Sequence, residues 1–253
     1  MMDLFGDERA VSDVLAFIIV FSMIITSVAL VYGTGFSSIR DVRDGEQKAN
    51  AERALEAVAL SMDDIVKGQA TRRGGSLNLG GGQLRVDDST DVTVNVDGGT
   101  FSTTESIRSF EYYMDDTAVA YESGGVFRRD GSASVAVLRP TMKCTDGSAV
   151  VSLVRVKMDD KQSARAIGST DNVEVSMVEE STELLHSQTE SSSFEVVVDV
   201  DGTDYGPAWE RTLDEQDWTT TDWNGDGDTS EGKCTTKRVV VRLVVIELTY
   251  GSP

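Results

Sequence analysis

The sequence predicts an α+β protein in which one long N-terminal helix, membrane-spanning and then amphipathic, precedes an antiparallel β-sandwich-like domain. Three observations lead to this prediction. An uncharged apolar run occupies Val14–Tyr32, a one-sided apolar pattern continues to Val66, and short β-like runs separated by glycine turns fill most of the remainder. We therefore expect residues 11–68 to form the helix and residues 69–253 to form an acidic, β-rich extracellular domain.

The apolar run Val14–Tyr32 contains no Lys, Arg, Asp or Glu and has about the length that crosses a bilayer core as a helix. Ser12 or Asp13 can cap its first turn, where an acidic group also suits the positive end of the helix dipole. A cleaved secretory signal is less favoured, because no small-residue cleavage site follows the run at the expected distance. A plain signal anchor, which stays in the membrane as a single helix, is the simplest alternative.

Beyond Gly33 and Gly35 the apolar residues recur three or four positions apart, and charged residues fill the other side. This pattern is typical of an amphipathic helix whose stripe needs another surface to cover it. Gly68 and the pair Gly74-Gly75 are expected to end the helix. The stripe consists of Ile39, Val42, Ala49, Leu55, Val58, Ala59, Met62, Ile65 and Val66.

From Ser76 onward the pattern predicts short strands, with Gly124-Gly125 and Asp130-Gly131 as hairpin signals. The last run is too apolar for an exposed edge, so we expect it in the centre of a sheet. Pro207 at a first-turn position indicates one helical insert over Ala208–Asp217. The expected strands are Leu77–Leu79, Gln83–Val86, Asp91–Val96, Ile107–Tyr113, Ala118–Glu122, Val126–Arg129, Ser132–Arg139, Ala149–Met158, Val173–Val178, Phe194–Val200 and Arg238–Tyr250.

The chain carries 43 acidic and 23 basic residues, a formal net charge of −20. A heavy excess of Asp with few Lys keeps proteins hydrated in very high salt, where charge repulsion is screened over short distances. The composition resembles that of haloarchaeal proteins, and a generically acidic extracellular domain is the alternative. Nucleic acid is not an expected partner, because phosphate binding depends on Lys and Arg.

The two cysteines, Cys144 and Cys234, are too far apart in sequence for a local metal or redox pair. In an extracellular domain they can close a loop of about ninety residues, which is worth roughly 4–5 kcal/mol in the chain-entropy model. We expect a disulfide, with two free buried thiols as the alternative.

The N-terminal residues Arg9-Ala10-Val11-Ser12-Asp13-Val14-Leu15-Ala16-Phe17-Ile18 resemble the start of haloarchaeal type IV pilins. Both have a basic residue, a small residue, a short polar step and then an unbroken apolar helix. The later segment Val119–Arg129, which ends near Pro140, is similar to uncharacterised haloarchaeal pilin-like membrane proteins, although a hairpin explains the same residues. The resemblance covers about the first quarter of the chain.

The resemblance implies that residues 1–10 are a leader, cut between Ala10 and Val11 by a prepilin-type peptidase on the cytoplasmic side. The retained helix then packs with copies of itself or related pilins in a filament, with Val14, Phe17 and Phe21 at the contacts. Asp13 pairs with the new amino terminus of a neighbouring chain in this interpretation, and otherwise is only an N-cap. Membrane lipid surrounds the helix before assembly. The basic residues around the span, Arg9 before it and Arg40 and Arg43 after it, do not favour an outside C-terminus.

A possible calcium loop lies at Asp222-Trp223-Asn224-Gly225-Asp226-Gly227-Asp228. Oxygen donors alternate along it, and a glycine stands at the sixth position, where calcium loops turn sharply. Asp222, Asn224, Asp226 and Asp228 are the candidate ligands. Lys233 occupies the place of the usual bidentate Glu, so an ordinary acidic turn is the alternative reading.

The sequence gives little support to catalysis. His186 is the single histidine, and phosphate-binding, serine-hydrolase and zinc-protease motifs are absent from the sequence. Adjacent acidic pairs such as Asp63-Asp64 are expected on so acidic a surface. Trp209, Trp218 and Trp223 are expected to pack the helical insert, with a surface patch for a partner or sugar as the alternative. We therefore expect a non-enzymatic, pilin-like surface protein without a required cofactor, first in the cell membrane and then in a surface filament. The alternative is a permanently anchored extracellular ligand-binding protein, which calcium can assist.

Overall fold

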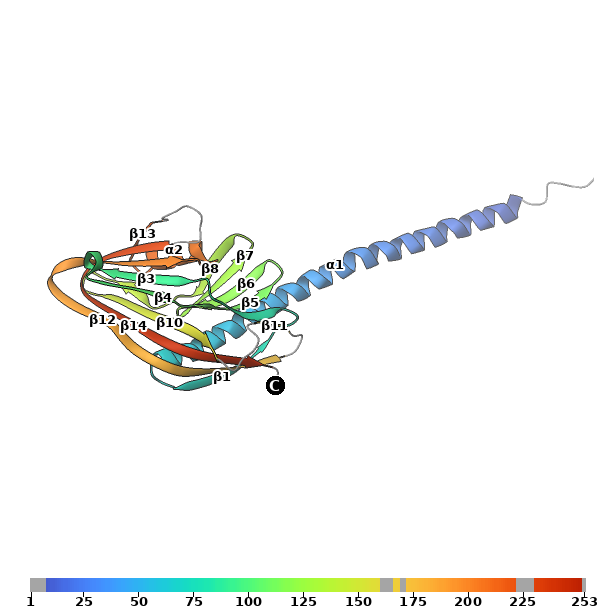
Figure 1. The fold of residues 1–253 in the computed structure, drawn as a ribbon. Coiled ribbons are helices and arrows are strands. Elements are labelled where there is room, and N and C mark those ends of the chain that lie inside the picture. Colours follow the sequence, from blue (N-terminus) through green and yellow to red (C-terminus); the bar gives the residue numbers. More distant parts are fainter. Residues whose placement is uncertain (1–7, 160–165, 169–171, 222–229, 252–253) are drawn as a thin grey trace, which may run out of the picture. The chain divides into compact units, whose positions relative to one another are not determined.

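The computed structural model describes residues 8–159, 166–168, 172–221 and 230–251, without the side chains of residues 8–11, 34–41, 44 and 221. It confirms the α+β class, because an N-terminal apolar helix precedes a mostly antiparallel β-domain (Figure 1). Helix α1 (Glu8–Val66) has 59 residues. The chain divides into two compact units, Met1–Gln47 and Lys48–Pro253, so α1 contributes residues to both. We call the second unit the β-domain.

The β-domain contains fourteen strands and two short helices among the described residues. They are β1 (Arg72–Asn78), β2 (Gln83–Asp87), β3 (Asp91–Val96), η1 (Asp97–Gly99), β4 (Phe101–Ser106), β5 (Ser109–Met114), β6 (Thr117–Glu122), β7 (Gly125–Asp130), β8 (Ala133–Leu138), β9 (Met142–Cys144), β10 (Ala149–Met158), β11 (Ala166–Gly168), β12 (Asn172–Asp201), α2 (Gly206–Asp214), β13 (Thr219–Thr221) and β14 (Ser230–Gly251).

These strands form two sheets within the described part of the chain. One has the order β4-β3-β12-β14-β10-β9, with β1 also paired to β12 and β13 to β14, and the other has the order β11-β2-β5-β6-β7-β8. The expectation of an antiparallel domain is wrong at one place, because β10 and β14 pair in parallel. Parallel neighbours need a long connection between them, and β11, β12 and α2 lie in that connection. The apolar run Arg238–Tyr250 is central as predicted, since β14 lies between β12 and β10.

Strands β12 and β14 run side by side over most of their lengths, orange and red in Figure 1. The prediction of separate strands at Val173–Val178 and Phe194–Val200 is wrong, because both belong to the 30-residue β12. The middle of β12 is largely polar and exposed, so no apolar alternation marks it in the sequence. Its pairing with β14 shifts register at three places, the widest between Thr189 and Phe194. The sequence interpretation also missed β4, β9, β11 and β13, which are short or weakly apolar.

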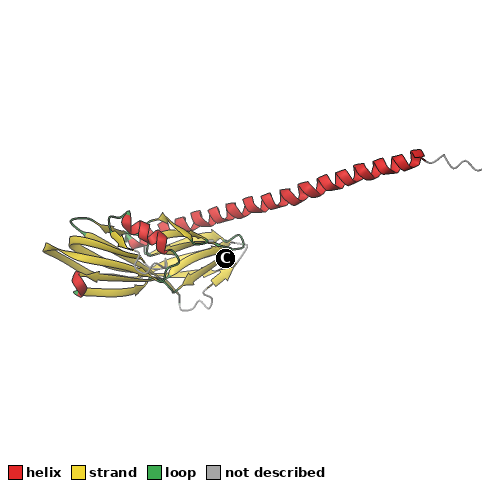
Figure 2. Ribbon diagram, turned by 90° about the horizontal axis from the view of Figure 1, so that it is seen from above, coloured by secondary structure: helices red, strands yellow, loops and turns green. Residues whose placement is uncertain are grey.

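The C-terminal part of α1 is a core element of the β-domain. Leu55, Met62 and Ile65 are each at most 1% exposed and share a hydrophobic cluster with Val154 of β10 and Tyr121 of β6. Figure 2 shows this part of the red helix running alongside the yellow strands. The amphipathic stripe is therefore confirmed in its second half and not at Val42, which is 63% exposed.

A second hydrophobic cluster lies on the other face of β6 and contains the buried residues of α2. Helix α2 has Pro207 in its first turn, as expected, although it ends at Asp214 rather than Asp217. Trp209 is fully buried there, which confirms the core role predicted for it. The two hairpin signals are also confirmed, since Gly124 (φ 88°) and Gly131 (φ 60°) occupy left-handed turn positions beside β7.

Candidate functional site

The first candidate site is the apolar surface of α1 in the N-terminal unit. Residues Ser12–Gly33 have a mean hydropathy of 2.8 and are not buried, and the segment has the length and composition of a membrane span. Val14, Phe17 and Phe21 are 58%, 67% and 54% exposed, and the two phenylalanine rings stack with centroids 5.9 Å apart. An apolar surface of this size on all sides of a helix requires lipid or protein to cover it.

The structure brings the predicted leader site into α1. Ala10 and Val11 lie within the helix, which begins at Glu8, and their side chains are outside the described residues. Asp13 is exposed one turn further along. Two polar residues of this segment bond to their own helix, since the Thr26 and Ser27 hydroxyls donate to carbonyls four residues earlier at 2.7 and 2.8 Å. These bonds reduce the cost of placing the two hydroxyls in lipid.

The predicted disulfide between Cys144 and Cys234 is present. It joins β9 to β14, with an S–S distance of 2.05 Å and a Cα–Cα distance of 5.8 Å. Both cysteines are buried, at 7% and 1% exposure. The bond closes a loop across 90 residues and joins the edge strand β9 to the central strand β14.

The candidate calcium loop, with Asp222, Asn224, Asp226 and Asp228, lies outside the described residues, as does Trp223. Within the part of the chain that is described, no three His, Cys, Asp or Glu side chains gather as a metal-binding group. His186 stacks on Phe101 of β4, with ring centroids 4.4 Å apart, and shares a hydrogen bond with Gln188.

The acidic pair Asp63-Asp64 serves surface ion pairing at the end of α1. Asp63 pairs with Lys67 at 2.5 Å and Asp64 with Arg73 of β1 at 2.9 Å. These side chains are more than a third exposed on average, and exposed pairs contribute little stability. Their contacts therefore give no reason to read the pair as catalytic carboxylates.

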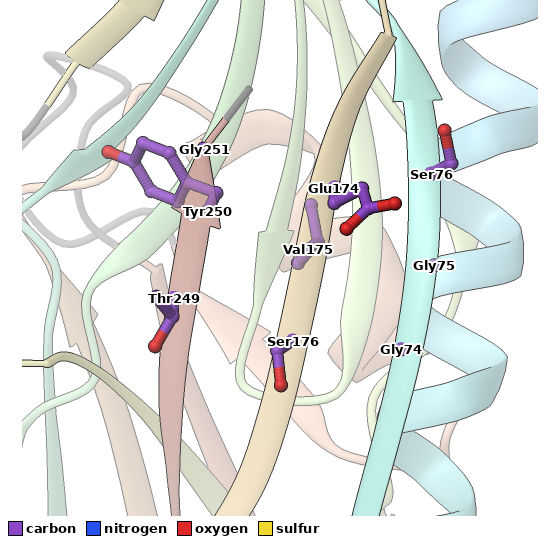
Figure 3. Close-up of a pocket in the computed structure, with 9 residues that line it drawn as sticks. All are labelled: Gly74, Gly75, Ser76, Glu174, Val175, Ser176, Thr249, Tyr250 and Gly251. Carbon is purple, nitrogen blue, oxygen red and sulfur yellow. The ribbon is translucent and has the colours of Figure 1, made fainter. Parts of the chain in front are cut away.

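A groove of about 580 Å³ crosses the ends of β1, β12 and β14. Figure 3 shows that its nine lining residues come from these three adjacent strands. The register places Gly74, Ser176 and Thr249 in one cross-strand row, and Ser76, Glu174 and Gly251 in another. Small side chains in both rows leave the sheet surface hollow, while hydroxyls and the exposed Glu174 carboxylate give it polar character. Residue Val175, between the rows, is buried on the opposite face.

A further candidate site, after the apolar helix surface and the groove, is a pair of buried carboxylates that the sequence interpretation did not single out. Glu122, at the end of β6, is 1% exposed and accepts three hydrogen bonds. Its Oε1 accepts from the Thr90 hydroxyl at 3.0 Å, and its Oε2 accepts from the Thr203 hydroxyl at 3.0 Å and the Trp209 indole at 2.7 Å. Glu122 therefore connects β6 to the loop before β3, to the segment after β12 and to α2.

The second carboxylate of the pair, Glu111 of β5, is 2% exposed. It accepts a hydrogen bond from the Tyr205 hydroxyl at 2.6 Å and an ion-paired one from Arg85 Nε at 2.5 Å. Burial raises the pKa of the Tyr205 phenol, and the neighbouring Glu111 carboxylate raises it further. Burial also raises the pKa of Glu122 to about 7, although its three hydrogen bonds act in the opposite direction.

A sequence signal for Glu122 does exist. Strand alternation puts position 122 on the same face as Ala118 and Ala120, which are both fully buried. A Glu in phase with two buried alanines is a candidate for a buried, hydrogen-bonded carboxylate. Its partners at positions 90, 203 and 209 are distant in sequence, so no local pattern predicts them.

Comparisons with known proteins identify a family for this chain but no activity. The family model described as "Family of unknown function (DUF7289)" matches residues 9–249. The search of curated proteins found no match. Among solved structures, the crystal structure of the ywiB protein from Bacillus subtilis is 11% identical, with 73% of this chain and 94% of that chain covered and a TM-score of 0.11. At that score the likeness carries no argument about fold.

Proposed function

This chain belongs to the family of unknown function DUF7289, and we propose that it is a type IV pilin-like subunit of an archaeal cell-surface filament. In this proposal residues 1–10 are removed, the helix from Val11 inserts in the membrane, and the acidic, sandwich-like β-domain stands outside the cell. The helix then self-assembles with copies of the chain or with related pilins. The protein acts by assembly and by surface contact rather than by catalysis.

The observation that carries this proposal is the exposed apolar surface of Ser12–Gly33 within a helix whose other end is a core element of the β-domain. Lipid can cover that surface in the membrane, and identical helices can replace lipid in a filament. The disulfide supports an outside β-domain, because such bonds persist in oxidising compartments. The net charge of −20 also suits a subunit that faces a salty medium.

The decisive measurement is N-terminal sequencing, with intact mass, of the protein from its native membrane. A mature chain that starts at Val11 supports the proposal, while a chain that keeps Met1 or Met2 refutes it. Asp13→Asn tests assembly separately, because a pilin-like chain then loses the partner for its new amino terminus. Electron microscopy should show fewer filaments for this variant. Asp7→Asn is the matched control, since Asp7 leaves with the leader and its replacement should not change the filament number.

The groove across β1, β12 and β14 favours a second candidate, a permanently anchored extracellular ligand-binding protein. Its volume of about 580 Å³ lies in the usual range of ligand sites. An uncut chain that never polymerises would agree with this candidate. Calcium assistance through Asp222, Asn224, Asp226 and Asp228 predicts a higher melting temperature with calcium than with chelator at the same salt concentration. Equal melting temperatures would exclude it.

A further inference from the structure

A small cavity lies between the second sheet and the segment that leads into α2. Its volume is about 10 Å³, which is close to the least that one water-sized species requires. The two buried carboxylates, Glu111 of β5 and Glu122 of β6, both line it, and so does Ser109 at the start of β5. The cavity is therefore too small for an organic ligand and holds at most a single water molecule or ion.

The carboxylates around this cavity have more acceptor capacity than their donors use. A carboxylate offers about four lone-pair sites. Glu122 receives three hydrogen bonds and Glu111 two. Both side chains are at most 2% exposed, so bulk water does not supply the remainder. The unused lone pairs favour an occupant that is positive or donates hydrogen bonds.

Ser109 provides a second, independent indication of an occupant. Its side chain is 4% exposed, and its hydroxyl oxygen has no hydrogen-bond partner among the described residues. Leaving a buried hydroxyl unpaired costs about 1–3 kcal/mol, and native structures rarely tolerate this without a reason. Ser109 lies two residues before Glu111 on β5, so both side chains are on the same face of the strand, and an occupant beside Glu111 is within reach of this oxygen.

The charge balance around the cavity favours a cation over water. Four carboxylates line the cavity, those of Asp87, Asp204, Glu111 and Glu122, against the single guanidinium of Arg85. Arg85 pairs with Glu111 at 2.5 Å and with Asp87 at 3.7 Å.

Arg129 pairs with Asp204 at 3.3 Å. The three donors to Glu122 are all neutral groups, so its charge when ionised is not balanced by them. A buried carboxylate without a balancing charge is costly, and a bound cation would remove that cost.

We infer that this cavity binds one monovalent cation, Na⁺ or K⁺, through oxygens of Glu122, Glu111 and Ser109. Calcium and magnesium fit less well. Glu111 is already paired with Arg85, so the charge of one buried carboxylate, that of Glu122, remains to be balanced, and one positive charge is enough. Magnesium in addition keeps several of its waters, for which this cavity has no room. The cation would join β5 to β6 and balance the Glu122 carboxylate, which accepts the hydrogen bonds from Thr203 and Trp209, and so would stabilise the attachment of the α2 region. This inference does not depend on the role of the helix in the membrane.

The test is the thermal unfolding of the full chain in detergent, in NaCl, KCl or choline chloride at one ionic strength and at a pH above 8. Choline is too large for the cavity, so it serves as the reference cation. We expect the melting temperature in one or both alkali salts to exceed that in choline by about 5 °C when the cation is roughly 100-fold above its Kd. The increment should saturate with cation concentration, and the NaCl and KCl arms identify the preferred ion.

Ser109→Ala distinguishes a ligand from a merely unpaired hydroxyl. If Ser109 binds the cation, this variant loses most of the alkali-salt increment. Removal of an unpaired hydroxyl alone would leave the increment intact and raise the melting temperature equally in every salt. Glu122→Gln should also lose the increment, while Glu183→Gln, at an exposed position of β12, should keep it. Equal melting temperatures of the wild type in all three salts, or a full increment in Ser109→Ala, would overturn the inference.

Discussion

The indole Nε1 of Trp209 donates a hydrogen bond to Glu122 Oε2 at 2.7 Å, and both side chains are buried. This bond joins α2 to the end of β6 across 87 residues of sequence. It is a bond to a carboxylate in a dry environment, where such bonds are stronger than those between neutral groups. The attachment of the α2 region to the second sheet therefore depends on the protonation and pairing of one carboxyl group.

Trp209→Phe tests this dependence. The variant keeps an aromatic ring against Phe127 but removes the donor to a buried carboxylate, so we expect a loss of about 2 kcal/mol in the free energy of unfolding. Trp218→Phe is the matched control, because its buried indole donates to the neutral Met142 carbonyl at 2.7 Å. That loss should be nearer 1 kcal/mol. Chemical denaturation in one detergent buffer measures both, and a smaller loss for Trp209→Phe than for the control would contradict the argument.

The stability of the β-domain should fall as pH rises from about 5 to about 8 in choline chloride, where no small cation competes. Burial raises the pKa of Glu122 from 4.5 to about 7, so the folded chain holds a proton that the unfolded chain releases. The resulting stabilisation is complete below the unfolded pKa and is lost as pH passes through the folded value. Two and a half units correspond to about 3 kcal/mol. Glu111, Arg85 and Tyr205 lie near Glu122 and are present in both the wild type and a Glu122→Gln variant, so they do not account for a difference between the two proteins.

Glu122→Gln isolates this effect, because it removes the titration and keeps the side-chain shape. The Thr90 hydroxyl can reverse its role and accept from the new amide. We expect the free energy of unfolding of the variant to vary less with pH between 5 and 8 than that of the wild type. Parallel pH profiles for the two proteins would show that Glu122 does not titrate in this range.

Replacement of both cysteines, Cys144→Ala with Cys234→Ala, should reduce the free energy of unfolding by about 4–5 kcal/mol in the chain-entropy model. The disulfide closes a loop across 90 residues, and both sulfurs are buried. Alkylation of the wild-type protein in denaturant without reductant should label no cysteine, and alkylation in denaturant after reduction should label both. Labelling before reduction would contradict the disulfide.

The sequence was sufficient to predict those elements whose apolar residues alternate or repeat locally. The apolar run of the last strand, the turn glycines of β7 and the proline of α2 each predicted the observed element. The middle of β12 was not predictable in this way, since Leu184 is 66% exposed and the neighbouring positions are polar. Its strand conformation depends on pairing with β14, which the sequence does not show locally.

The candidate sites also differ in whether a local sequence pattern predicts them. The exposed apolar helix follows from the residue pattern, and the disulfide followed from the expectation of an extracellular domain. The carboxylate pair could not be predicted, because Glu111 and Glu122 acquire their burial from strands β2, β5 and β6 and from a helix ninety residues later. Desolvation is a property of the packed structure, and a single strand gives only the hint that Glu122 is in phase with buried alanines.

The β-domain begins within α1, earlier in the chain than the sequence indicated. The sequence placed the domain at residues 69–253, yet Leu55, Val58, Met62 and Ile65 of α1 are at most 3% exposed within the hydrophobic cluster that α1 shares with β6 and β10. A fragment of residues 48–253 keeps these side chains and lacks the apolar span. We therefore expect it to be soluble without detergent and to unfold cooperatively.

A fragment of residues 69–253 should fail to fold, because the face of β1, β6 and β10 that α1 covers would lie open to water. Leu55→Ala in the 48–253 fragment tests the same contact between α1 and the β-domain by removing a single buried side chain. Removing a fully buried leucine costs about 2–5 kcal/mol. Leu60→Ala is its control on the same helix, since Leu60 is 57% exposed and its loss should cost less than about 1 kcal/mol. Circular dichroism and thermal melting compare the four proteins, and a stably folded 69–253 fragment would show that α1 is not part of this core.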